Sequence, residues 1–157
     1  MTLFPPRTSN QRRRDTLHRL EHDVDAWIAT ADPASGTPYL VPLSFDWDGE
    51  CLLISTPTAS PTSRNLHATG SVRVGIGPTR DVVLIEGSVR PLARHEVSPE
   101  AGDAFAARTG FDPRALSTSY SWFQISPRRI QAWRESNELD GRELMRDGVW
   151  LVPHSDD

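Results

Sequence analysis

The chain has 157 residues, of which 37% are hydrophobic and 24% charged, which is typical of one globular domain with a single core. A net charge of −4 argues against a nucleic-acid-coating surface, and no apolar run is long enough to span a membrane. One cysteine, Cys51, excludes an internal disulfide and makes the reducing cytoplasm the simplest compartment.

The first elements in chain order are an arm and a helix. Two adjacent prolines and little periodicity predict a flexible arm over residues 1–11. Apolar residues then recur at helical spacing, which predicts an amphipathic helix over about residues 10–25. The apolar stripe expected to be buried consists of Leu17, Leu20 and Val24.

Most of the remaining chain has the pattern of strands separated by turn signals. The expected strands are 26–31, 38–46, 51–56, 71–77, 82–92, 120–125 and 130–135, and short helices are expected at 62–69 and 99–109. Asp48-Gly49 predicts a tight hairpin turn, and Pro42 marks its strand as an edge or a bulge. A final hairpin over residues 143–152 would turn at Asp147-Gly148. This order predicts a mainly β fold, a closed antiparallel barrel with helices attached.

Several short motifs are weaker than they look. His18 to His22 match the zinc-protease pattern HxxEH, but both histidines lie off the apolar stripe and no third ligand is near. A solvated helix face explains them fully. Cys51 stands in an apolar strand, which favours a core position over a nucleophile. Gly75-Ile76-Gly77 lacks the third glycine of a dinucleotide-binding loop.

The most informative segment is the hydroxyl-rich loop between the third strand and the helix at 62–69. A helix N-terminus attracts anions, and Thr56, Ser60, Thr62 and Ser63 add hydroxyl donors beside the positive charge of Arg64. All 17 basic residues of the chain are arginine, whose planar fork of donors suits phosphate. The residues alone leave two readings open, a phosphate cradle and an ordinary capped loop.

The order of helix, hairpin, Ser/Thr loop and the TSRNL helix resembles the flavin-binding split-barrel superfamily of pyridoxamine 5′-phosphate oxidases and F420-dependent oxidoreductases. The resemblance covers about residues 12–135 and implies a split antiparallel barrel of six or seven strands. It makes 12–135 the flavin-binding domain and leaves 136–157 as a C-terminal extension. The last region, RRIQAWRESNELDGRELMRDGVWL, lacks the histidine of a true pyridoxamine-phosphate oxidase.

The resemblance also implies where a cofactor would lie. The second strand would run along the flavin ring, and the following loop and helix would hold the ribityl chain and phosphate. The last strand would reach the cofactor of a second subunit through Trp133 or Trp122. The implied cofactor-binding residues are Val41, Pro42, Leu43, Ser44, Ser55, Thr56, Ser60, Thr62, Ser63, Arg64, Asn65 and Trp133.

The function that follows from the resemblance is an oxidoreductase that moves a hydride between FMN, or alternatively F420, and a small organic substrate. The cofactor carries this chemistry, so no catalytic side chain, metal, nucleic acid or membrane partner is expected. A homodimer with the cofactor at the subunit interface is expected. Two alternatives stay open, a non-catalytic carrier and a barrel that has lost its cofactor.

Two further hypotheses concern charged or ligating residues. The run Arg12-Arg13-Arg14 opposes the helix dipole, and we expect it to contact an acidic cofactor tail. A haem-binding relative of the same barrel would need an axial ligand, and His67 and His95 qualify by residue type alone.

Overall fold

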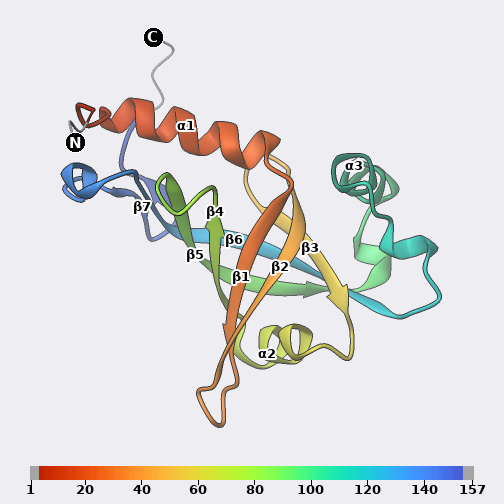
Figure 1. Cartoon of the computed structure of the whole chain (residues 1–157). Coiled ribbons are helices and arrows are strands. Elements are labelled where there is room, and N and C mark those ends of the chain that lie inside the picture. The colour runs from red at the N-terminus through yellow and green to blue at the C-terminus, as the bar shows by residue number, and fades with distance from the viewer. Residues whose placement is uncertain (1–3, 154–157) are drawn as a thin grey trace.

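The computed structural model describes residues 4–153 and contains a closed antiparallel barrel of six strands (Figure 1). The strand order is β3-β2-β1-β4-β5-β6, and β6 pairs back to β3 to close the barrel. The six strands are β1 (Asp25–Ala31), β2 (Pro38–Trp47), β3 (Leu52–Pro57), β4 (Ser71–Ile76), β5 (Val82–Leu92) and β6 (Tyr120–Trp133). The predicted split-barrel class with a leading helix and two inserted helices is confirmed.

The barrel interior is filled by inward-facing side chains from every strand, because alternate residues of each strand point inward. Fully buried members include Ile28, Phe45, Ile54, Ile85, Phe123 and Ile125. The predicted C-terminal hairpin is also present, as β7 (Glu143–Arg146) and β8 (Val149–Trp150), with its turn at Asp147 and Gly148. β7 pairs with β6, and its Leu144 joins the core.

Each of the three α-helices within residues 4–153 begins at a hydroxyl cap. The Oγ1 of Thr8 accepts the amide of Gln11 at the start of α1 (Ser9–His22). Ser60 and Ser98 cap α2 (Pro61–Thr69) and α3 (Pro99–Thr109) in the same way. α2 and α3 both end at a left-handed glycine. Among the described residues, no helix is long and apolar enough to cross a membrane.

The buried stripe of α1 differs from the prediction. Leu20 is buried as expected, but Leu17 is only half-buried and Val24 lies beyond the helix end. The other buried residues of α1 are Arg12 and Thr16. Arg12 can be buried because its guanidinium donates to main-chain carbonyls, including that of Glu138 at 2.8 Å.

β6 is one long strand where the sequence pattern predicted two. Pro127 interrupts the pattern, but it lies opposite Gly87, where the register between β5 and β6 shifts. Proline has no amide hydrogen to donate to the neighbouring strand, and the bulge at this point interrupts the ladder where that hydrogen bond would form. Gly87 also permits the close approach, because a Cβ on it would lie 2.5 Å from Cγ2 of Ile125.

The barrel opens between β2 and β3. β2 pairs with β1 over Pro38–Ser44 but with β3 only over residues 45–47. The edge position expected from Pro42 follows from this opening. α2 lies below the open part of the barrel in Figure 1, directly after the end of β3. The opening therefore brings the unpaired edge of β2 and the start of α2 to the same end of the barrel.

Candidate functional site

The start of α2 is organised first by its own hydroxyl groups. The Oγ of Ser60 accepts the amide of Ser63 at 3.1 Å and contacts Oγ1 of Thr56 at 3.2 Å. The carbonyl of Ser60 accepts the amide of Arg64 at 3.1 Å. Both main-chain amides are thus satisfied within the helix start, so attraction of an anion depends mainly on the side chain of Arg64.

Five of the predicted cofactor-binding residues are buried in this chain: Ser55, Thr56, Thr62, Ser63 and Asn65. Ser55 donates to the carbonyl of Ser121 on β6, and Asn65 donates to Oγ1 of Thr30 on β1 at 3.1 Å. These bonds fix α2 against the barrel. Among the described residues, the buried Oγ of Ser63 has no hydrogen-bond partner. A buried hydroxyl in that state costs roughly 1–3 kcal/mol, so it fits a site that an additional polar group completes.

Arg64 is the exposed member of the predicted set. Its guanidinium folds back over the loop before α2 and donates to the carbonyl of Ala59. A cavity of about 440 Å³ lies beside it, between α2 and the turn that joins β1 to β2. Tyr39 and Pro61 line this cavity together with Arg64 and Asn65. One exposed positive charge therefore lies beside a ligand-sized hollow.

The predicted ring-binding segment Val41–Ser44 lies on the unpaired edge of β2. Val41 and Leu43 pack against the core, whereas Pro42 is exposed on the outer face. The hydroxyl of Ser44 donates to Oδ1 of Asp25 across the β1–β2 pair at 2.6 Å. The main-chain groups of this edge are available to a ligand, because β3 does not pair with them.

The two tryptophans of β6 have different places. Trp122 is buried and packs edge-on against Phe105 of α3, with ring centroids 5.1 Å apart, so it belongs to the core. Trp133 lies at the other end of β6, roughly 35 Å along the strand from Trp122. The guanidinium of Arg142 lies 5.9 Å from its ring. Within one chain, Trp133 is therefore far from α2.

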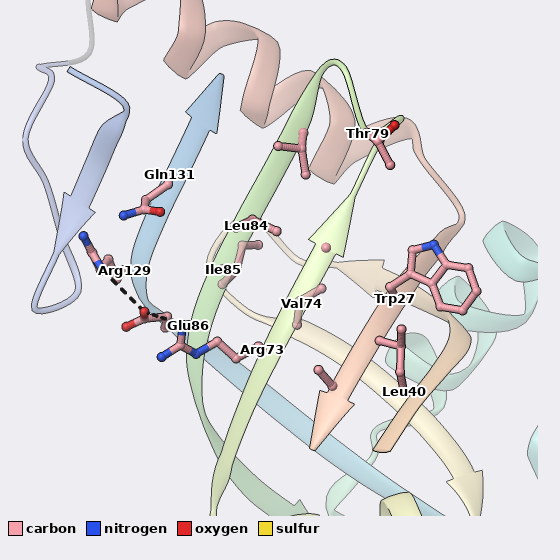
Figure 2. Close-up of a pocket in the computed structure, with 14 residues that line it drawn as sticks. Trp27, Leu40, Arg73, Val74, Thr79, Leu84, Ile85, Glu86, Arg129 and Gln131 are labelled. Atoms are coloured by element: carbon pink, nitrogen blue, oxygen red, sulfur yellow. Dashed lines mark hydrogen bonds and ion pairs between the residues drawn. The ribbon is translucent and has the colours of Figure 1, made fainter. Parts of the chain in front are cut away.

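The outer face of the sheet carries a second hollow that the sequence reasoning missed, here called the outer cavity (Figure 2). It encloses about 290 Å³ over β1, β4 and β5. Trp27, Leu40 and Leu84 border it and are 54%, 60% and 40% exposed. The sequence did contain one sign of this cavity, which is Trp27. Side chains alternate along β1, and because Ile28 faces the core, the large apolar ring of Trp27 faces outward.

Charged residues form one rim of the outer cavity. Glu86 lies between two arginines, 2.9 Å from Arg73 and 3.5 Å from Arg129 (Figure 2). Arg129 also donates to Glu143 at 2.6 Å, and this hydrogen bond lowers the pKa of the Glu143 carboxyl. The apolar face is thus bordered by a ladder of alternating charge.

The remaining sequence motifs have local roles. His18 and His22 stack on the exposed side of α1 at 4.1 Å, and Nδ1 of His22 contacts the carbonyl of His18. Nδ1 of His67 contacts the carbonyl of Ser63. Cys51 is half-buried and lies just before β3, so the core position predicted for it is wrong, and its partial burial raises the pKa of the thiol.

Two arginines of the predicted tail-binding run, Arg12 and Arg13, make contacts within the fold. The guanidinium of Arg13 lies over the ring of Trp150 at 4.6 Å and donates to the carbonyl of Val152. Together with the buried Arg12, it ties α1 to the C-terminal part of the chain. An anionic cofactor tail would have to compete with these contacts.

Comparisons with known proteins agree with this architecture. Residues 18–134 match the family model described as pyridoxamine 5′-phosphate oxidase. A search of curated proteins found no match. Three solved structures share the fold at TM-scores of 0.58 to 0.63.

The first of these structures is an F420 reductase, 21% identical, with 72% of this chain and 93% of that chain covered (TM-score 0.58). The second is an FAD-binding protein from Mesorhizobium loti, 16% identical, with coverages of 74% and 90% (TM-score 0.60). The third is a protein related to general stress protein 26 from Clostridium acetobutylicum. It is 11% identical, with coverages of 80% and 90% (TM-score 0.63). At these identities the likeness concerns the fold.

Proposed function

The chain belongs to the pyridoxamine 5′-phosphate oxidase family, and we propose that it is an oxidoreductase that binds a flavin-type cofactor. The bound cofactor would exchange a hydride with a small organic substrate, which is chemistry the flavin or deazaflavin ring itself supplies. FMN is the proposed cofactor and F420 the alternative. Among the structural neighbours, one is named an F420 reductase and another an FAD-binding protein.

The observation that carries the proposal is the opening of the barrel beside Arg64. The open edge of β2 offers main-chain donors and acceptors over Val41–Ser44 to the heteroatoms of a planar ring. Arg64, which lines the cavity beside α2, offers the charge for a phosphate, whereas the unsatisfied hydroxyl of Ser63 is buried. Ser55, Thr56 and Asn65 would act indirectly, by holding α2 in place.

A homodimer fits the same proposal. The exposed apolar side chains of Trp27, Leu40 and Leu84 form a face that a second copy would cover. The rim beside it carries both signs of charge, through Glu86 and Arg129, which is compatible with a self-complementary two-fold interface. A partner covering this face would shelter a cofactor from water and could bring its own β6 residues to it.

The second candidate function is a carrier without catalysis, or a barrel without a cofactor. The observation that favours it is that hydrogen-bonding groups before α2 already have partners within the chain, since Ser60 caps the helix. One exposed arginine, Arg64, is then left at this helix start to bind a phosphate. A phosphate site with a single exposed arginine offers few charged hydrogen bonds to the ligand.

The test is an absorbance and fluorescence titration of the protein with FMN and, separately, with F420. We expect saturable binding of one cofactor and roughly a 10- to 100-fold weaker affinity in Arg64→Ala, since a charged hydrogen bond is lost. Arg94→Ala, an exposed arginine on another segment, should leave the affinity unchanged. Binding of neither cofactor would refute the proposal.

Binding without reduction by any tested electron donor would favour the carrier. Sedimentation of the loaded protein tests the dimer independently, because a monomer that binds cofactor would refute only the interface.

A further inference from the structure

A separate hollow, here called the hairpin cavity, lies where α3 packs against the β2–β3 hairpin. It encloses about 480 Å³, within the size range of small-molecule sites. Trp47 and Cys51 form the hairpin wall, and Val97 and Ala101 form the wall of the α3 segment. Its floor comes from β3, β5 and β6. α2 follows the end of β3, and Leu53 in the cavity floor lies about 13 Å along the strand before that end. The cavity is therefore separate from the start of α2.

Both walls are held in place without a ligand. The oxygen Oδ1 of Asp48 accepts the amides of Glu50 at 2.8 Å and Cys51 at 2.7 Å, which fixes the hairpin turn. On the other side, Arg108 near the end of α3 donates to the carbonyls of Leu20 and Asp23. The cavity is therefore preformed, and a ligand would not have to order it.

Its lining combines apolar surface with a few oriented polar groups. Trp47 is half-buried, and Leu53, Leu92 and Val97 provide aliphatic contact. Arg90 is held by Glu96 at 2.8 Å and by the side-chain oxygen of Gln124 at 3.4 Å. An aromatic ring with fixed polar groups around it selects a ligand that has an apolar body and a polar end.

The charge of the lining decides which polar end is favoured. Glu96 is paired with Arg90, and Asp46 lies 3.5 Å from Arg108. Asp48 and Glu100 also line the cavity, and neither forms an ion pair within residues 4–153. Asp48 accepts two main-chain amides and Glu100 stands in the first turn of α3, but no arginine of the described chain neutralises either carboxylate. The lining therefore keeps a net negative charge next to an aromatic ring, a combination that attracts organic cations and repels anions.

We propose that the hairpin cavity binds a small organic cation with an aromatic or apolar body. The ring of the ligand would lie against Trp47 and the aliphatic floor, and its ammonium group would lie toward Asp48 and Glu100. This site is independent of the proposed cofactor site, because it uses other residues and a different end of β3.

The experiment compares two probes with the same ring and opposite charge, tryptamine and indole-3-propionate, by calorimetric titration of the protein without flavin. Tryptamine should bind saturably, and at least about tenfold more tightly than indole-3-propionate. Asp48→Asn with Glu100→Gln should abolish this preference. Glu21→Gln, which removes an exposed charge from α1, should preserve it. Equal affinity for both probes, or no saturable binding of tryptamine, would overturn the proposal.

A second measurement locates the bound probe. Cys51 is the only cysteine of the chain and lines the hairpin cavity, so its labelling by a disulfide reagent reports occupancy. Tryptamine should slow the labelling, and the concentration that gives half of the effect should equal the dissociation constant measured by calorimetry. Ala104→Trp, which fills the cavity from its exposed α3 side, should remove both effects. Tryptamine binding with an unchanged labelling rate would place the probe elsewhere and refute the site.

Discussion

Replacing Glu138 by glutamine tests how the two ends of the chain are joined. The residue is 2% exposed, and its carboxylate accepts three hydrogen bonds from the main-chain amide and the guanidinium of Arg7. A fourth comes from the amide of Arg134. Glu138→Gln keeps the shape and one acceptor but removes the one fully buried counter-charge of Arg7, whose guanidinium keeps only the more exposed carboxylates of Asp15 at 3.0 Å and Asp81 at 3.4 Å.

The expected loss is about 3 kcal/mol at neutral pH. Removing one partner of a buried ion pair costs roughly 3–5 kcal/mol. The pKa gives a similar figure, because hydrogen bonds from Arg7 lower the pKa of Glu138 from 4.5 to about 2, which corresponds to about 3 kcal/mol. For a chain of this size, the melting temperature should fall by about 6–12 °C.

The assay is urea unfolding of both proteins across a pH series. The pKa of Glu138 is lower in the folded state, so its contribution to stability is complete above pH 4.5. It is lost as the pH falls from 4.5 toward 2. The difference in unfolding free energy between the wild type and Glu138→Gln should therefore shrink over that interval.

Two results would refute this reasoning. One is a difference below about 1 kcal/mol at pH 7, which is the range of an exposed pair. The other is a large difference that stays constant down to pH 2, because it would assign the loss to packing instead of charge. Glu21→Gln, an exposed carboxylate on α1, serves as the control and should change stability little at any pH.

Three further predictions follow from single positions. Gly77→Ala should cost roughly 1–3 kcal/mol in urea unfolding, because Gly77 has φ of 85° and a Cβ would lie 2.6 Å from the carbonyl oxygen of Asp81. Gly36→Ala, at a similar φ of 71° with nothing within 4 Å, should cost less, and equal losses would contradict the steric argument. Phe123→Ala should cost about 3–5 kcal/mol by thermal or urea unfolding, because the side chain is fully buried, and a loss below 1 kcal/mol would mean that the core refills the space. Leu40→Glu should shift the sedimentation coefficient to that of a monomer without lowering monomer stability, and an unchanged dimer would exclude the outer face as the interface.

Much of the barrel followed from the sequence alone. β5 and α3 have the predicted bounds, and Gly70 and Gly110 stand directly after the predicted ends of their helices. These features depend on local physics, namely alternation of side chains, proline and serine at helix starts, and glycine at left-handed caps. The hairpin turns at Asp48-Gly49 and Asp147-Gly148 were predictable for the same reason.

The errors came from contacts between distant segments. The sequence pattern divided β6 at Pro127, but pairing with Gly87 carries the strand through a bulge. Arg12 looked like a solvent-facing or ligand-binding residue, yet carbonyls some 120 positions away surround it. No local pattern reports such a partner, because an arginine is stable inside a protein only where tertiary structure supplies acceptors.

The candidate site also combines features that the local sequence predicts with features that depend on tertiary contacts. Sequence order determined that a hydroxyl-rich loop, an arginine and a helix start would follow the third strand, and the TSRNL motif indicated the family. Only the tertiary structure decided which of those side chains are free. It buried Ser55, Thr56 and Asn65 in bonds to β1, β6 and the loop, and left Arg64 exposed. It also gathered Trp27, Leu40 and Leu84 from three strands into one apolar face, because strand pairing sets which residues become neighbours.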